Sequence, residues 1–340
     1  MMQESDLPLV TFALISYRQS EFICESVQSV LAQDYPNLEI ILSDDCSPDN
    51  TYQLIEMLGA NYRGPHHLVL NSNSQNLGLA RHVNRVCELA SGLIVVIGAG
   101  DDIFSPDRVS HIVSAFKQNS DVYSVYSNAF YIDEVGEQLP GSLGQYRKIL
   151  PGTPKNVFEG RAHAYGCVHA WKKESYSTFG PLHPDVVYED QAISMRSALL
   201  GEIAYIDMPL VKYRMHSSNL ALGRNRRTRE QFETVYRRKI FETQQFIRDL
   251  TFFCETPQQT SSVTQKTKDA KKLLLRAEAR LAMLQKVDSL KQGNSITVWL
   301  PLMLQLWESL FRDRSVFLML LQKIFPISIS VKNWLQYLFR

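Results

Sequence analysis

Two adjacent carboxylates, Asp101 and Asp102, follow the apolar run at residues 93–97 and a short glycine-containing turn. Neighbouring carboxylates repel each other, so they are tolerated together mainly where a cation or solvent relieves the repulsion. In a sheet with helices on its faces, ligands bind at the carboxyl ends of the strands. The pair therefore indicates a metal or phosphate site at the end of a strand.

Two other acidic clusters stand in comparable positions. Asp44 and Asp45 follow the apolar residues 38–42 and begin a turn-rich loop. Glu189 and Asp190 precede apolar residues with helical spacing, so both carboxylates are expected in the first turn of a helix. Carboxylates of this kind can hold a cation or accept a proton.

The elements that carry these clusters are strands alternating with helices. Apolar runs of buried-strand length occupy residues 9–16, 38–42, 67–70 and 93–97, and polar loops follow them. From Leu79 onward, apolar residues recur on one side of a helix. Repeated strand and helix units with apolar strands predict an α/β fold with a mostly parallel sheet covered on both faces.

Several common sites are missing from the sequence. No G-x-G-x-x-G follows the first strand and no G-x-x-x-x-G-K-[ST] occurs, so neither a dinucleotide site nor a P-loop is supported. The 5 cysteines are scattered and contain no C-x-x-C pair, which argues against a disulfide framework and a zinc site. Residues 1–8 lack the basic and apolar regions of a secretory signal, and we expect a cytoplasmic protein.

Charge is distributed unevenly along the chain. Residues 1–220 contain 15 Lys and Arg against 25 Asp and Glu, and residues 221–340 contain 21 against 10, which gives −10 and +11. The Arg-rich run at residues 224–229 has no interleaved aromatic residues, so nucleic-acid binding is not predicted. An acidic catalytic part and a basic extension attracted to anionic lipid are the better interpretation.

Five segments together resemble the inverting family 2 glycosyltransferases, which have the GT-A fold. The segments are residues 16–17, 29–36, 41–51, 76–81 and 100–106. Their order and spacing match over about the first 220 residues, which is more specific than any single motif. The resemblance implies transfer of a sugar from a nucleoside-diphosphate sugar to an acceptor hydroxyl, with inversion at the anomeric carbon.

The resemblance also implies where the donor lies. Ser16 and Tyr17 match the loop at the nucleotide base, and Asp45 matches the carboxylate that accepts a hydrogen bond from a uracil or thymine imide. The expected donors are therefore UDP-sugars or dTDP-sugars. Asp44 could orient the same loop. Arg81 matches a basic residue that contacts nucleotide or diphosphate, although it could instead belong to a solvated helix face.

The Asp-Asp turn matches the family's metal motif with one departure. Ala99 stands where the family has its first Asp. Asp101 is then the expected ligand of Mg²⁺ or Mn²⁺, and Asp102 helps it or contacts the nucleotide sugar. His216 matches a histidine that approaches the metal or diphosphate, with Arg214 as a possible phosphate partner. The alternative is that the two aspartates only cap the following helix.

The catalytic base of the family lies in its Glu-Asp pair. By this match Asp190 deprotonates the acceptor hydroxyl and Glu189 supports or orients it. The same two residues could instead be ordinary acidic residues at a helix N-terminus. Local sequence does not distinguish the two interpretations.

Beyond residue 220 the resemblance fades. We expect a catalytic domain over residues 1–220, a helical extension over 221–292 with helices near 228–253 and 264–290, and amphipathic helices over 293–340. The last segment is too interrupted to span a bilayer. Its aromatic residues and basic flanks fit helices in the membrane interface, although core or dimer contacts would produce similar stripes. A peripheral protein on the cytoplasmic membrane face is expected.

The resulting hypothesis is a metal-assisted glycosyltransferase in bacterial cell-surface polysaccharide or O-antigen assembly, acting on a lipid-linked or oligosaccharide acceptor. Two alternatives stay open. Ala99 makes an inactive module that binds a sugar nucleotide conceivable. A nucleotidyltransferase would share the need for nucleotide and metal, but no Gly-rich basic loop follows the first strand.

Overall fold

The computed structural model describes residues 7–144, 150–162, 165–216, 229–256 and 261–289. Contacts between residues divide the chain into two compact units, Met1–Leu284 and Gln285–Arg340. The expected boundaries after residues 220 and 292 both fall outside the described residues. The elements of the first half are β1 (Val10–Ser16), α1 (Ile23–Leu31), β2 (Leu38–Asp44), α2 (Thr51–Asn61), β3 (His67–Ser72), α3 (Leu79–Leu89), β4 (Ile94–Ala99), β5 (Ile103–Phe104), α4 (Arg108–Gln118) and β6 (Val122–Ile132).

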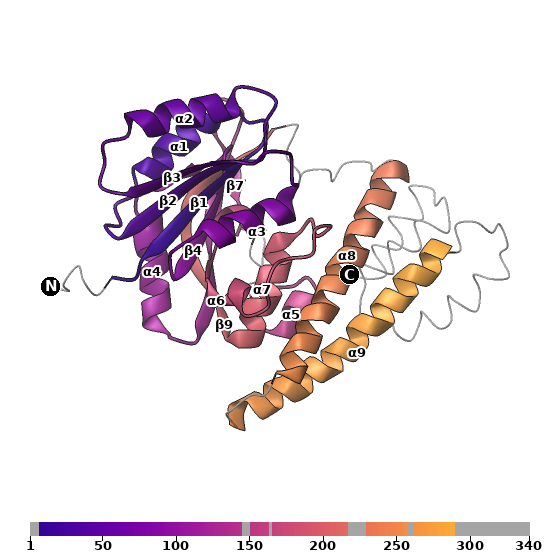
Figure 1. Cartoon of the computed structure of the whole chain (residues 1–340). Helices are drawn as coiled ribbons and strands as arrows, with labels where there is room; N and C mark the ends of the chain where they lie inside the picture. Colours follow the sequence, from indigo (N-terminus) through magenta and orange to yellow (C-terminus); the bar gives the residue numbers. More distant parts are fainter. Residues whose placement is uncertain (1–6, 145–149, 163–164, 217–228, 257–260, 290–340) are drawn as a thin grey trace. The chain divides into compact units, whose positions relative to one another are not determined.

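The remaining elements complete one sheet and add a helical region. They are β7 (Gln138–Ser142), α5 (Pro154–Phe158), the 3-10 turn η2 (Gly166–Val168), β8 (His169–Lys172), α6 (Glu174–Ser177), α7 (Glu189–Leu200), β9 (Glu202–Arg214), α8 (Arg229–Glu255) and α9 (Ser261–Ser289). The sheet has the strand order β3-β2-β1-β4-β8-β6-β9-β5, with β7 on β6. Figure 1 shows the arrangement of these elements and labels most of them.

The first four strands form the parallel part of the sheet. β1 lies between β2 and β4, and β3 pairs with the outer side of β2. The register places Ser16 beside Asp44 and Ile15 beside Ala99. Because parallel strands end at one edge, the polar segments that follow β1, β2 and β4 come together there.

The second part of the sheet is mixed. β8 is antiparallel to both β4 and β6, while β6 and β9 are parallel to each other over most of their length. The short strands β5 and β7 add antiparallel pairs to β9 and β6. The predicted α/β fold is confirmed, and its sheet is mostly parallel with antiparallel insertions that the alternating pattern of the first half does not reveal.

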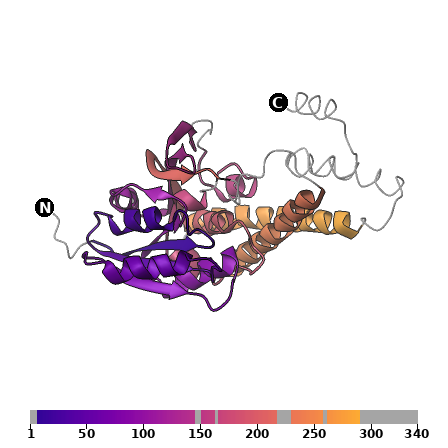
Figure 2. The same ribbon diagram turned by 90° about the horizontal axis from the view of Figure 1, so that it is seen from above.

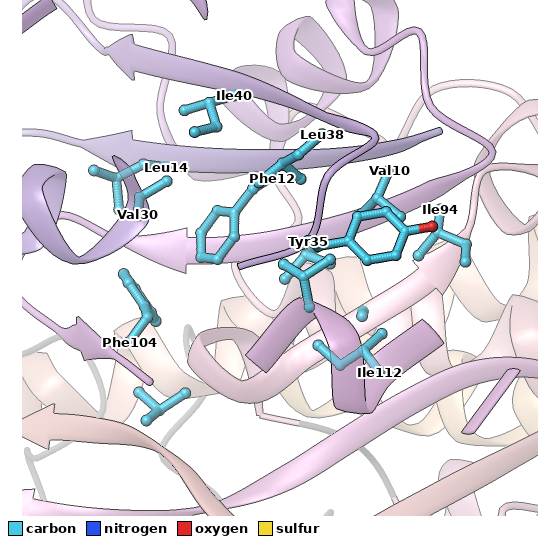
Figure 3. Packing of buried hydrophobic residues seen from close by; sticks show 14 of the residues in the cluster. Val10, Phe12, Leu14, Val30, Tyr35, Leu38, Ile40, Ile94, Phe104 and Ile112 are labelled. Carbon is cyan, nitrogen blue, oxygen red and sulfur yellow. The ribbon is translucent and has the colours of Figure 1, made fainter. Parts of the chain in front are cut away.

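Alternating side chains of the central strands build a core on each face of the sheet. Val10, Phe12 and Leu14 of β1 pack with α1 and α4 on one face (Figure 3). Ala13 points to the other face, where α3 and α7 supply the packing. Seen from above in Figure 2, helices lie on both sides of the N-terminal strands. Period-two alternation in strands that are buried on both faces explains their continuous apolar sequence.

Two serines near helix starts do not cap those helices. α1 begins at Ile23 after Phe22 and α4 begins at Arg108 after Asp107, with no side-chain cap in either case, so neither Ser20 nor Ser105 is an N-cap. Ser105 instead donates its hydroxyl to the Asp107 carboxylate. Ser and Asp residues close to a helix start compete for the same role.

The helical region packs against α5 and α7. Phe246 and Leu250 of α8 and Leu273 of α9 form a third apolar cluster with residues of α5 and α7. Among the described residues, no helix combines the length and apolar character needed to cross a membrane. The interfacial helices expected over residues 293–340 lie outside the described residues.

Candidate active site

The turn after β4 brings Asp101 together with His216. Nε2 of His216 lies 2.9 Å from Oδ2 of Asp101, and both side chains are largely buried. Asp102 is fully buried, and its Oδ1 accepts a hydrogen bond of 3.0 Å from the backbone N–H of Arg214. Burial, together with the neighbouring charge of Asp101, raises the pKa of the Asp102 carboxyl well above its usual value. The turn and the segment after β9 therefore form one unit.

Arg214 holds this unit together. Its Nε donates to the Asp101 carbonyl at 2.9 Å, and its Nη1 donates to the carbonyls of Asp133 and Glu134 at 3.1 and 2.9 Å. Its Nη2 donates to Glu25 of α1 at 2.6 Å. The guanidinium is buried and its fork is directed at protein groups, so the phosphate contact considered from sequence is not what the structure shows. The fold uses Arg214 to shape the turn.

Neither Asp101 nor Asp102 caps α4, the helix that follows the turn. α4 begins at Arg108 with Asp107 as its N-cap, while Asp102 accepts from Arg214 and Asp101 pairs with His216. The alternative in which the two aspartates only cap the following helix is therefore excluded. Their positions are set by a segment more than a hundred residues away in sequence.

Asp45 and Asp44 shape the loops that follow β2 and β3. Oδ1 of Asp45 accepts from the Asn73 side chain and from the Leu77 N–H, both at 2.8 Å, and Oδ2 accepts from the Gly78 N–H at 2.9 Å. Asp44 accepts from the Ser47 N–H at 2.7 Å. Each carboxylate oxygen has two lone pairs. Oδ2 of Asp45 thus keeps capacity for one further donor, such as a base imide.

Other residues predicted for the donor site differ in exposure. Ser16 is buried, and its hydroxyl donates to the Ser43 carbonyl at 3.2 Å. Tyr17 is 38% exposed. Arg81 is exposed in the first turn of α3, close in sequence to Gly78 and its contact with Asp45. The buried members shape the loops, and the exposed ones offer an aromatic ring and a cation at their surface.

A buried polar network that links the ends of β2 and β3 to α3 was not predicted from the sequence. Nε2 of His82 lies 2.6 Å from the Ser43 hydroxyl, which also accepts from Asn71 at 2.9 Å. Asn71 also donates to Asn73, the residue that binds Asp45. Burial lowers the pKa of His82, against the opposing effect of the nearby carboxylates. The available signal was a histidine inside the apolar face of α3, which more often indicates a satisfied core residue.

Glu189 and Asp190 begin α7, as the sequence predicts. Glu189 is buried against η2, where a Cβ on Gly166 would lie 2.6 Å from Oε1 of Glu189. A larger residue at position 166 would therefore force the Glu189 carboxylate to shift. Burial, followed by the charge of Asp190, raises the pKa of Glu189 to about 8. Asp190 is partly exposed, so it is the member of the pair that a substrate can reach.

The 3-10 turn η2 lies next to both acidic segments. It contacts β4 and β9, whose ends lead to Asp101 and His216, and its Gly166 approaches the Glu189 carboxylate. Burial and the carboxylates of Asp102, Asp101 and Asp190 raise the pKa of the Cys167 thiol. The turn after β4 and the start of α7 are therefore neighbours of the same short element, although they are distant in sequence.

Arg108 fastens η2 to the central sheet and was missed from the sequence. Its Nη2 donates to the carbonyls of Ile97 and Cys167 at 2.9 and 3.1 Å. Its guanidinium carbon lies 4.9 Å from the ring centroid of Phe104. Burial lowers the pKa of Arg108 to about 10. An arginine in the first turn of a helix gives no local sign of such a role.

The turn offers few protein ligands for a cation. Within the described residues, no group of three or more His, Cys, Asp or Glu side chains is arranged to hold a metal. Asp101 and His216 supply two ligand atoms, and Oδ2 of Asp102 is buried without a protein hydrogen-bond partner. Mg²⁺ is commonly bound by one or two carboxylates plus substrate phosphates. The residues therefore fit a cation that is completed by a diphosphate.

Comparison with known proteins agrees with this arrangement. The model of glycosyl transferase family 2 matches residues 11–179. An uncharacterized glycosyltransferase of Nostoc sp. (strain PCC 7120) is 25% identical over 245 residues, which cover 71% of this chain and 74% of that protein.

Two solved structures share the fold. One is the mannosyltransferase PcManGT from Pyrobaculum calidifontis in complex with GDP-Man and Mn²⁺, with 18% identity, a TM-score of 0.50, and coverage of 94% of this chain and 85% of that one. The other is S. aureus TarS 1–349 in complex with UDP-GlcNAc, with 14% identity, a TM-score of 0.52, and coverage of 84% and 93%. Motif, sequence relative and fold agree: the chain contains a glycosyl transferase family 2 domain and is a glycosyltransferase with the GT-A fold.

Proposed function

We propose that the protein transfers a sugar from a nucleoside-diphosphate sugar to an acceptor hydroxyl, with the help of a divalent cation and with inversion at the anomeric carbon. The observation that carries the proposal is the position of η2, which contacts β4 and β9 near the Asp101 and His216 pair and approaches Glu189 through Gly166. One corner suits a departing diphosphate, and the other suits an attacking hydroxyl.

On this proposal the donor nucleotide occupies the edge formed by the loops after β1, β2 and β3. Tyr17 offers a ring to the base, Asp45 an acceptor for its imide, and Arg81 a cation for the phosphates. A UDP-sugar or dTDP-sugar is the donor we expect, because both bases carry an imide N–H. PcManGT and TarS are each in complex with a nucleotide sugar, which supports the donor class.

Asp101 and His216 would hold Mg²⁺ or Mn²⁺, with Asp102 as an additional ligand. When bound, the cation neutralises the charge that develops on the departing diphosphate. Arg214 keeps Asp101 in place through the hydrogen bond from its Nε to the Asp101 carbonyl, and it keeps Asp102 in place through the hydrogen bond from its own backbone N–H. PcManGT is in complex with Mn²⁺, which supports the use of a divalent metal.

Asp190 is the proposed general base. Its carboxylate takes the proton of the acceptor hydroxyl while the hydroxyl oxygen forms a bond to the anomeric carbon and the bond to the diphosphate breaks. General-base assistance of this kind contributes about 10² to 10⁴ in rate. Glu189, buried behind it with a pKa raised to about 8, orients the start of α7. One displacement inverts the anomeric centre, and no covalent intermediate on the protein is required.

For the acceptor we propose a lipid-linked or oligosaccharide chain of a bacterial surface polysaccharide, such as O-antigen, at the cytoplasmic face of the membrane. The support is the composition of residues 293–340, which combine aromatic and basic residues. Flotation of the full chain with vesicles containing anionic lipid, compared with a chain that ends at Gln292, tests this. Equal flotation of the two proteins would remove the membrane part of the proposal.

The enzyme proposal is tested with a panel of nucleotide sugars. The protein's thermal unfolding midpoint is measured with each donor and Mn²⁺, because a bound ligand raises stability by mass action. We expect one UDP-sugar or dTDP-sugar to stabilise the protein and to release nucleoside diphosphate in a metal-dependent reaction. Failure of every donor to bind would contradict the proposal.

Ala99 favours a second candidate function. It lacks the carboxylate that the family has at this position, and its carbonyl accepts a hydrogen bond of 3.1 Å from Ser26. A module that binds the sugar nucleotide without reacting is therefore considered. Donor binding without any nucleoside diphosphate release, with either Mg²⁺ or Mn²⁺, would favour that function.

A further inference from the structure

Helix α8 lies beside α7 and beside the loop that leads to it, residues 179–188 (Figure 1). The family model ends at residue 179, so α8 lies wholly beyond it. A helix outside the family domain could be a separate module. Its contacts show instead how closely it is connected to the segment that carries Glu189 and Asp190.

Polar contacts tie α8 to the first part of this loop. Nε and Nη2 of Arg196 in α7 donate to the Asp249 carboxylate at 2.8 and 3.0 Å, and both side chains are fully buried. Nη1 of the same arginine donates to the Gly180 carbonyl at 2.7 Å. One buried ion pair thus joins α8, α7 and the loop, with the bidentate geometry that makes such contacts strong.

A second polar contact lies one helical turn away. The Gln245 side chain accepts from the His183 N–H at 2.8 Å and donates to Asp249 at 2.9 Å. Arg248 adds a contact of 3.2 Å to the Pro181 carbonyl. On the opposite side, Asn84 of α3 both donates to and accepts from the backbone of Leu182. The loop is held between α3 and α8.

Ring contacts continue along α8 to the residue before the acidic pair. The rings of Phe252 and Phe179 are 5.5 Å apart, and those of Phe241 and His183 are 5.9 Å apart. The guanidinium carbon of Arg238 lies 6.0 Å from the ring centroid of Tyr188. Tyr188 is the N-cap position of α7 and directly precedes Glu189.

The contacting residues of α8 repeat with helical spacing. They are Arg238, Phe241, Gln245, Arg248, Asp249 and Phe252, which recur every three or four residues and so share one face. As this face is followed from its C-terminal to its N-terminal end, its partners run in order from Phe179 to Tyr188. The helix and the loop therefore lie antiparallel and in register.

We propose that α8 is a positioning element for the acceptor side of the site, and that Gln245, Asp249 and Arg238 are positioning residues for Asp190. The proposal rests on the function proposed above, because it takes Asp190 as the base. Misplacement of a catalytic group by about 1 Å can cost about 100-fold in rate. A face that fixes the loop at five points is suited to prevent such misplacement.

The test compares Gln245→Met and Arg238→Met with the control Arg237→Met, which changes an exposed neighbour of Arg238 on the same helix. The full chain is used with the donor and Mn²⁺ found in the nucleotide-sugar panel. Measured are hydrogen exchange of residues 179–190, donor affinity, and the rate of nucleoside diphosphate release with water as the acceptor. Arg238→Lys, which keeps a cation over the ring, tests rescue.

We expect faster exchange at residues 179–190 and about 10- to 100-fold slower release in both variants, with donor affinity within twofold of wild type, partial rescue by Arg238→Lys and no effect of Arg237→Met. Unchanged exchange in both variants would overturn the proposal. Faster exchange with unchanged release, in a protein that Asp190→Asn inactivates, would reduce α8 to a structural role and also overturn it. Full activity of Asp190→Asn would contradict the proposed base instead.

Discussion

The proposed donor side of the site and its proposed acceptor side are held in place by different means. On the donor side, Asp45 accepts hydrogen bonds from three N–H groups. Asp101 is paired with His216, and its carbonyl accepts a hydrogen bond from Arg214. On the acceptor side, Glu189 is buried against Gly166, and the loop before it is held by α8. The donor side is preorganised by the edge of the sheet, whereas the acceptor side depends on a helix beyond the family domain.

Because of this difference, substitutions on the two sides should affect different properties, namely ligand binding on one side and reaction rate on the other. Changes on the donor side should alter binding of the metal and nucleotide, because those residues lie on strands and loops fixed by hydrogen bonds. Changes on the acceptor side should alter the rate, because Asp190 is proposed to act only when the hydroxyl attacks. Each prediction below tests one side against the other.

The largest effect is expected from Asp190→Asn. The substitution keeps the shape of the side chain and removes its ability to accept the acceptor proton, so turnover should fall about 10² to 10⁴-fold. Donor affinity, measured by calorimetry with Mn²⁺, should stay unchanged. Normal turnover in a folded variant would show that the base lies elsewhere.

The stability of the acceptor side should depend on pH through Glu189. Its pKa rises from 4.5 in the unfolded chain to about 8 on folding, so the native state binds more protons than the unfolded chain between those values. The contribution of protonated Glu189 to the free energy of unfolding is fully present below the pKa of the unfolded chain. This contribution is lost as the pH rises through about 8. The free energy of unfolding should fall by roughly 2–4 kcal/mol between pH 5 and pH 8.

Urea denaturation at several pH values measures this dependence. Glu189→Gln, which cannot ionise, should show a flatter pH profile than wild type. A wild-type profile as flat as that of the variant would mean that Glu189 stays ionised in the folded protein.

On the donor side, His216→Ala should weaken Mn²⁺ binding. Loss of the imidazole beside Asp101 removes one of the two paired ligand atoms, and we expect an affinity loss of about 10- to 100-fold. Titration followed by the electron paramagnetic resonance of free Mn²⁺ provides the measurement. His111→Ala, a histidine on α4 paired with Asp107, is the matched control and should bind Mn²⁺ normally.

The smallest effect is expected at Arg81. This side chain is exposed, so its contact with a phosphate is screened, and Arg81→Met should reduce donor affinity by about 3- to 10-fold. Arg85→Met is the control, because Arg85 lies one turn further along α3 and pairs with Glu88 at 3.7 Å. Equal losses in the two variants would indicate a general charge effect and would place Arg81 outside the donor site.

The donor side was the more predictable of the two. Apolar strands followed by Asp44, Asp45, Asp101 and Asp102 place those carboxylates at one sheet edge, because local periodicity determines where parallel strands end. The family resemblance added what periodicity does not contain, a candidate role for His216, which the structure places beside Asp101. It also suggested a phosphate contact for Arg214, which was wrong because the partners of a buried guanidinium are decided by distant backbone carbonyls.

The acceptor side could be predicted only in part. Helical spacing places Glu189 and Asp190 at the start of α7, but nothing local indicates that Arg108 fastens η2 or that α8 lies along residues 179–188. The antiparallel strand β8 was missed for a similar reason, because four residues do not carry a readable period. Contacts between distant segments determined these features.

The stereochemistry of the reaction is the most direct test of a donor bound on one side and a base acting from the other. The anomeric proton of the product is followed by NMR during early turnover, with the donor identified in the nucleotide-sugar panel. Attack by a hydroxyl activated by Asp190, in a single displacement, predicts a product whose anomeric configuration is opposite to that of the donor. A product that retains the donor configuration would contradict this account.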